Sequence, residues 1–280
     1  MHPIRLWFDP THAHSVEIAP LVLATVERAW DVQVDQLGFR PPVLPDAADG
    51  PSFDVYLVDY QPFAAFVTAD GYATDPVAGD GYNAASSFMV VDRELPDVAV
   101  PAFLSHEFNH ACQYATDWSE STLPLWEATA TAAQDWTLDD DGHWAYDVPS
   151  FQEVPWAPVL TGDSYTIWPQ SGLGYTYEYG AALWVQFLDR SSAVPGTAGA
   201  ALWEAAANDG PDPEPDVVDA FAEVAGGTLG EALNAFAVVR FLTGDDWDAR
   251  GLAAAAGWTA AYAVPAAPLA GDALPLAGYA

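Results

Sequence analysis

The segment His106-Glu107-Phe108-Asn109-His110 constrains this chain more than any other feature of its sequence. It lies within residues 102–116, which are predicted to be helical. Side chains four residues apart lie one turn apart on the same face of a helix, so both imidazoles can bind one metal ion, and Glu107 can take a proton from a metal-bound water. The alternative is a chance match on an amphipathic helix, expected on the order of once in two hundred chains of this His and Glu content.

The composition indicates a folded, strongly acidic protein. Of the 280 residues, 51% are hydrophobic, enough for a full core, while 40 acidic residues face 7 arginines and no lysine, for a formal net charge of -33. Such a charge repels nucleic acid and anionic membrane surfaces, so neither is an expected partner. It favours basic or neutral substrates, although a high-salt habitat would explain the acidity equally well.

The single cysteine, Cys112, excludes an internal disulfide. On the motif helix it is turned about 200° away from His110, which favours a buried core thiol over a metal ligand. No apolar run has the length of a membrane span, and residues 1–8 lack the apolar region of a signal peptide. We therefore expect no membrane insertion. Two locations stay open: secreted or extracellular, with an export signal that this chain lacks, or cytoplasmic.

Hydrophobic periodicity predicts an α+β fold. The N-terminal part has strands at residues 4–8, 53–60 and 86–92, the last one central because it is apolar on both faces. One long helix covers residues 16–37, and the segment 11–14 (Thr-His-Ala-His) is expected to cap it rather than to bind a metal ion. Residues 71–83, rich in Gly, Asp and Tyr, are expected to be a loop.

The part after the motif helix is predicted to be mainly helical. Helices are expected at residues 123–138, 179–189, 198–207, 216–225 and 229–243, and the aromatic, Pro-rich stretch 139–174 is expected to be a long loop. We predict an N-terminal α+β lobe with the motif helix at a cleft (1–122), a helical C-terminal lobe (123–262), and a linker or the start of an accessory domain (263–280).

A catalytic zinc takes three protein ligands and keeps a fourth position for water. Asp117 is one candidate, but Gln113 and Thr116 stand where a metzincin has its Gly and its third ligand. The methionines, Met1 and Met89, also both precede the motif, so a metzincin is excluded.

The preferred third ligand is Glu127, on the next predicted helix, where small neighbours would allow close packing against the motif helix. Its alternative is an ordinary surface glutamate. Thr131 and Asp135 follow one and two turns later and could hold the second nitrogen of a histidine, or simply serve as a cap and a solvated face.

The motif helix and the helical glutamate resemble the gluzincin branch of the zincin metalloproteases, with a thermolysin-like architecture. The chain is more closely similar to secreted bacterial metalloproteases in two places, at residues 106–113 and 126–131. The likeness extends over most of residues 1–262, although only these two motifs are specific. It implies a zinc endopeptidase fold, often followed by a β-rich accessory domain, of which residues 263–280 could be the beginning.

The chain departs from thermolysin at two positions. Thr131 stands where thermolysin has an aspartate, and the histidine that stabilises the transition state has no counterpart, since His143 is the only downstream histidine. A tyrosine of the group Tyr175, Tyr177 and Tyr179 could donate to the oxyanion instead, and Tyr179 is our choice. Aromatic packing is the alternative.

The predicted function is that of a monomeric zinc endopeptidase acting on a peptide or protein. One Zn²⁺ held by His106, His110 and Glu127 activates water, and Glu107 is the general base. The run 139–142 (Asp-Asp-Asp-Gly) offers carboxylates for Ca²⁺ but lacks the spacing of an EF-hand, which favours a solvated turn. The alternatives are a catalytically silent zincin-fold binding or adhesion protein and a structural metal site.

Overall fold

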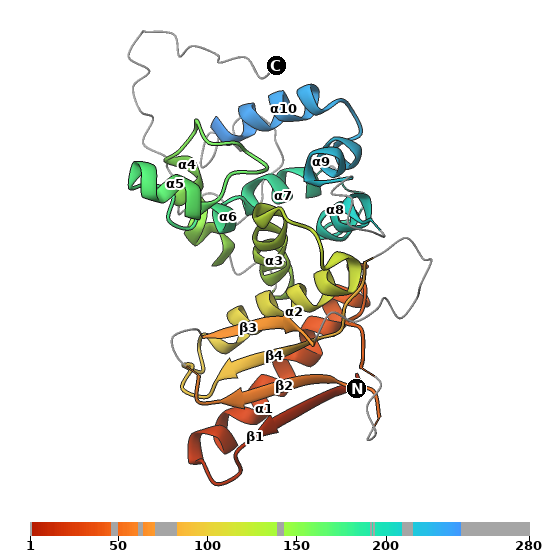
Figure 1. Ribbon diagram of the computed structural model, residues 1–280, viewed down its shortest axis with the longest axis vertical. Coiled ribbons are helices and arrows are strands. Elements are labelled where there is room, and N and C mark those ends of the chain that lie inside the picture. The colour runs from red at the N-terminus through yellow and green to blue at the C-terminus, as the bar shows by residue number, and fades with distance from the viewer. Residues whose placement is uncertain are drawn as a thin grey trace.

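A computed structural model describes residues 2–45, 50–60, 64–70, 83–138, 143–190, 192, 194–208 and 215–241. The chain has an α+β fold, with a four-stranded mixed sheet in its N-terminal part and helices through the rest (Figure 1). Residues 71–82, the acidic run 139–142 and the tail 263–280, for which a loop, a solvated turn and a linker or the start of an accessory domain are predicted, lie outside the described residues.

The sheet has the strand order β1-β2-β4-β3. The strands are β1 (Ile4–Phe8), β2 (Phe53–Val58), β3 (Ala65–Ala69) and β4 (Ser87–Asp92). β1 and β4 pair parallel with β2, whereas β3 pairs antiparallel with β4 at the edge. The three predicted strands and the inner position of the last one are confirmed. β3 was not predicted, because a five-residue strand with alanine at both ends is too short to show an alternation, even though Phe66, Val67 and Thr68 favour strands.

The long N-terminal helix is interrupted, so the prediction of one continuous helix over residues 16–37 is wrong in detail. It consists of α1 (Ala13–Ala29) followed by a π-helical segment, η1 (Trp30–Val34). The segment 11–14 caps the helix as expected, and the structure identifies His12 as the N-cap, whose side chain accepts a hydrogen bond from the Ser15 backbone. Side chains of α1 and of one face of β2, such as Phe53, join the same core.

Two helices connect the sheet to the C-terminal part of the molecule. They are α2 (Val100–Asp117), which packs on β3 and β4, and α3 (Leu123–Thr137), which packs on α2 (Figure 1). Both confirm predicted helices. Ala128 and Ala132 of α3 are fully buried, and such small side chains let the two helices approach closely.

The remaining helices form the C-terminal part. They are η2 (His143–Asp147), α4 (Val148–Gln152), α5 (Ser164–Ser171), α6 (Tyr177–Gly180), α7 (Ala182–Asp189), α8 (Ala198–Ala206), α9 (Val217–Ala225) and α10 (Leu229–Phe241). The prediction of an unstructured loop over residues 139–174 is therefore wrong for η2, α4 and α5. Helices of five to eight residues are too short to show a hydrophobic period.

One hydrophobic core extends from α1 in the N-terminal part to Phe236 of α10. The predicted division at residue 122 falls in the turn between α2 and α3, which share this core, and it stays a prediction. Within the described residues, no helix is long and apolar enough to cross a membrane.

Candidate metal centre

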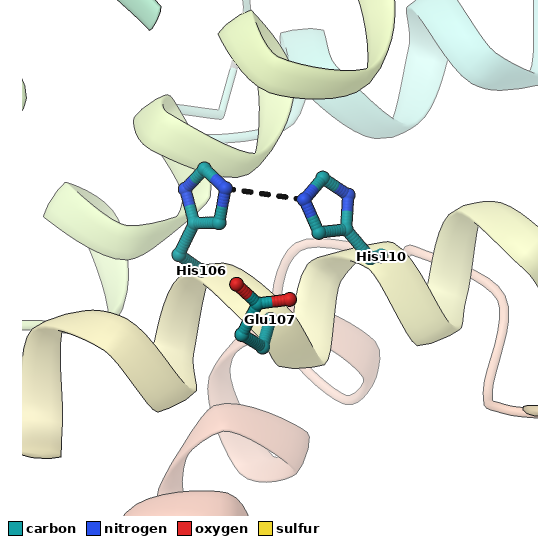
Figure 2. Close-up of side chains that lie close together, drawn as sticks. All are labelled: His106, Glu107 and His110. Atoms are coloured by element: carbon teal, nitrogen blue, oxygen red, sulfur yellow. Dashed lines mark hydrogen bonds between the residues drawn. The ribbon is translucent and has the colours of Figure 1, made fainter. Parts of the chain in front are cut away.

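α2 presents the two motif histidines on one side, as their spacing predicts. Figure 2 shows the two rings one turn apart on the same side of the helix, with the Glu107 carboxylate between them in this view. The His106 and His110 Nε2 atoms are 3.1 Å apart, and the rings meet edge to face. Two ring nitrogens at this separation can share one hydrogen bond or bind one cation.

α3 adds the predicted third ligand. Glu127 Oε2 lies 3.1 Å from His106 Nε2 and 3.5 Å from His110 Nε2. The three donor atoms thus form a triangle with edges of 3.1, 3.1 and 3.5 Å. Donors at zinc-ligand distances in a tetrahedral site are about 3.3 Å apart, so this donor set fits zinc in both element and spacing. His106, His110 and Glu127 are called the metal centre below.

Glu107 lies next to the metal centre. One of its carboxylate oxygens lies within 4.8 Å of a ring nitrogen of both histidines, and the residue is buried. Glu107 and the histidines could themselves hold an ion, but the separations of 3.1 and 3.5 Å to the two Nε2 atoms make Glu127 the better candidate for the third ligand.

The metal centre is electrostatically coupled. Burial alone would lower the pKa of His110, but the Glu127 carboxylate outweighs burial and raises this pKa to about 9. Burial alone would raise the pKa of Glu127, but His110 and His106 hold it well below the ordinary range. Without a metal ion, His110 and Glu127 therefore form a buried ion pair at neutral pH, with a proton where a cation could sit.

The second nitrogen of His110 contacts a residue for which no role was predicted. His110 Nδ1 lies 2.6 Å from Gln113 Oε1, one turn further along the same helix. Thr131, suggested for this role, has a buried hydroxyl with no hydrogen-bond partner among the described residues, and its role stays a prediction. Gln113 reaches His110 within α2, whereas Thr131 would have to reach across from α3. Asp135 is buried on α3, and its role stays a prediction.

Tyr179 lies beside the metal centre. Its ring stacks on that of His106, with centroids 5.7 Å apart and an interplanar angle of 23°. Burial raises the pKa of Tyr179, and Glu127, Glu178 and Glu107 raise it further, so the phenol stays protonated and able to donate.

The two other tyrosines considered for this role are placed differently. Tyr177 is buried and donates to the Pro158 carbonyl, and Tyr175 is exposed and packs on Trp168. The position of Tyr179 depends on Gly180, since a Cβ on Gly180 would overlap the Asp147 backbone carbonyl.

Two further side chains of α2 have no role in the metal centre. Asp117, rejected as a ligand, accepts hydrogen bonds from Ser119 and from the Asn208 backbone. Cys112 is a free, fully buried thiol, as predicted, and burial raises its pKa well above the ordinary value.

A pocket of about 350 Å³ lies on the sheet face that points away from the helices. Its lining includes Asp54, Tyr56 and Phe88 and none of the predicted site residues. This pocket is therefore separate from the metal centre.

Comparisons with protein-family models, with curated proteins and with solved structures found no match for this chain. The geometry around the motif helix is therefore the ground on which a function can be proposed.

Proposed function

We propose that this protein is a zinc-dependent endopeptidase with a zincin-like fold of the gluzincin type. One observation carries the proposal. Two imidazole nitrogens and one carboxylate oxygen meet with separations of 3.1 to 3.5 Å, and a second carboxylate, that of Glu107, stands beside them. Three ligands plus an adjacent base are what hydrolysis by an activated water requires.

The ligand count favours a catalytic over a structural ion. Structural zinc sites are closed by four protein ligands, whereas the metal centre has three, which leaves one position for a small molecule. The side chains of His106, His110 and Glu127 are between 9 and 15% exposed, so the cluster is not sealed from solvent. A water molecule or a substrate carbonyl could reach it.

In the proposed mechanism, zinc would be held by the two histidines and Glu127 and would supply a Lewis acid that polarises a carbonyl and acidifies water. Glu107 takes the proton of the attacking water and returns it to the leaving amine. Tyr179, protonated at neutral pH, donates a hydrogen bond to the developing oxyanion. The peptide bond is thereby replaced by a carboxylate and an amine.

The fold offers a place for an extended peptide. β3 is an edge strand that packs beside α2, and among the described strands one side of its backbone has no partner. A peptide could add to that edge by main-chain hydrogen bonds. The net charge of -33 would favour substrates with basic side chains.

The test is Glu107→Gln, with Glu17→Gln as the control, because Glu17 is an exposed glutamate of α1. We expect Glu107→Gln to bind zinc as the unmodified protein does and to lower kcat on a casein or peptide-library substrate by about 100- to 10,000-fold. Zinc content is measured by mass spectrometry, and a chelator should abolish cleavage. Full turnover by Glu107→Gln would refute the general base. Zinc bound without cleavage of any peptide would favour a binding protein instead.

A further inference from the structure

We propose that Gln33, Asn109 and Gln113 form a buried amide relay that fixes the orientation and the tautomer of His110. The three side chains are fully buried and are linked in series. Asn109 Nδ2 donates to Gln33 Oε1 at 3.0 Å, Gln113 Nε2 donates to Asn109 Oδ1 at 2.8 Å, and Gln113 Oε1 accepts from His110 at 2.6 Å. The three residues are positioning residues, and the inference rests on the proposed role of His110 as a ligand.

Next to His110, only one orientation of the Gln113 side-chain amide satisfies its hydrogen bonds. Gln113 Nε2 lies 2.9 Å from the Trp126 backbone carbonyl, which can only accept a hydrogen bond. The amide nitrogen of Gln113 must therefore face α3, and its oxygen must face His110. An acceptor at this distance requires the proton on His110 Nδ1. In the neutral ring, the lone pair is then on Nε2, which points at Glu127 and His106.

At the other end of the relay, the hydrogen bonds of Gln33 independently require amide orientations that agree with that of Gln113. Gln33 Nε2 lies 2.7 Å from the Ser105 backbone carbonyl, another obligate acceptor, so Gln33 Oε1 must face Asn109. Asn109 then turns its nitrogen to Gln33 and its oxygen to Gln113, which the Gln113 nitrogen requires. Reversing any single amide would place like atoms face to face, and such a contact between buried polar groups is costly.

The relay also donates hydrogen bonds to the backbone next to the other two proposed ligands. Ser105 directly precedes His106, and Trp126 directly precedes Glu127, so the two anchoring carbonyls belong to the backbone next to these ligands. Gln33 lies in the π-helical segment η1 and also donates to Thr137 Oγ1 of α3. The π-helical segment η1 thus places the Gln33 amide where it hydrogen-bonds to both α2 and α3.

A purely structural network would hold helices together without affecting the ring of His110, so the test measures the tautomer as well as stability. The variants are Gln113→Met, which removes the acceptor, and Gln113→Glu, which restores an acceptor but no donor. The control is Gln186→Met, since Gln186 is a buried helical glutamine whose Nε2 has no hydrogen-bond partner in the described part of the chain. Nitrogen-15 NMR across an alkaline pH series reports the tautomer of the neutral His110 ring in chelator-treated protein.

We expect the unmodified protein and Gln186→Met to show only the Nδ1–H form of His110. Gln113→Met should show a mixture of both tautomers and bind zinc about 10- to 100-fold more weakly, the usual effect of losing the partner of a ligand histidine. Gln113→Glu should recover the Nδ1–H form and most of the zinc affinity but stay less heat-stable, because its carboxylate faces the Trp126 carbonyl.

Unchanged tautomer and unchanged zinc affinity in Gln113→Met would overturn the relay, leaving only a structural network. The result is separable from the proposed function. If the unmodified protein binds no zinc but shows the Nδ1–H form that Gln113→Met loses, the zinc enzyme is refuted and the relay stands. If zinc binds and supports cleavage while Gln113→Met behaves like Gln186→Met, the enzyme stands and the relay is refuted.

Discussion

Two clusters that combine histidine and carboxylate side chains occur in the described part of the chain, and they differ in burial and in the number of histidines. One is the metal centre with its neighbour Glu107. The other, the surface cluster, consists of His2, Asp31 and Asp35, where His2 Nε2 lies 2.7 Å from Asp31 and 3.8 Å from Asp35. The two carboxylates of the surface cluster are 62 and 55% exposed, against 15% for Glu127.

The contrast indicates what would distinguish the proposed metal site from a surface ion pair. The surface cluster has one imidazole, stacked on Trp30, and water can replace each of its contacts at little cost. In the metal centre, two imidazoles and a carboxylate are desolvated together, so a proton or a cation has to sit among them. The amide relay further directs His110. We infer that burial and fixed hydrogen-bond direction, more than residue type, separate a metal site from a surface ion pair.

The largest expected difference between the clusters is in zinc affinity. Glu127→Ala and Asp31→Ala each remove a carboxylate that lies within about 3 Å of a histidine Nε2 atom. We expect Glu127→Ala to weaken zinc binding by at least about 100-fold, the upper range for merely disturbing a ligand's partner, because a ligand itself is lost. Asp31→Ala should leave the affinity unchanged. Competition with a chromogenic chelator measures both.

Equal losses in the two variants would show that burial does not separate the clusters. An unchanged affinity in Glu127→Ala would instead transfer the third-ligand role to Glu107, the other carboxylate near both histidines. Circular dichroism of each variant checks that the helices remain folded.

A smaller effect is expected from the residue that stacks on the metal centre without being a ligand. Tyr179→Phe keeps the ring on His106 and removes the hydroxyl. We expect kcat to fall about 100-fold, as when one oxyanion donor is lost, with zinc affinity unchanged. Tyr175→Phe is the control, because Tyr175 is exposed and packs on Trp168. Equal turnover in Tyr179→Phe and the unmodified protein would leave Tyr179 as aromatic packing.

The long elements of the fold and the candidate site residues could be predicted from the sequence, whereas the short elements could not. The strands and the long helices show up as hydrophobic periods, and His106, Glu107, His110 and Glu127 follow from spacing on two helices that pack together. β3 and the short helices α4 and α5 were missed because each is too short to show a period.

Most of the residues that hold the proposed ligand His110 in place could not be predicted from the sequence. Gln113 could have been found, because a residue three positions after His110 lies on the same helical face. Gln33 could not, since its partner Ser105 is 72 residues away and the π-helical segment that aims it at α2 has no sequence signal. Contacts set by tertiary packing have no local pattern.

The smallest effect concerns stability as a function of pH in the chelator-treated protein. The pKa of His110 is raised from 6.5 to about 9, so its contribution to stability is full below pH 6.5 and is lost as the pH rises through about 9. The pKa of Glu127 is lowered, so its contribution is full above its ordinary value of 4.5 and is lost only in strong acid. The ion pair therefore stabilises the fold most between pH 4.5 and 6.5.

We expect the chelator-treated protein to lose on the order of 2 kcal/mol of unfolding free energy between pH 6 and pH 9.5, which lowers Tm by several degrees for a domain of this size. Zinc should remove this loss, because the ion replaces the proton that His110 would release. Scanning calorimetry with and without zinc measures both, and Glu127→Gln is the control, since it removes the negative charge that raises the His110 pKa. The surface cluster is unchanged in both proteins, with and without zinc. An alkaline loss of equal size in Glu127→Gln would therefore assign the pH dependence to other groups and not to the buried pair.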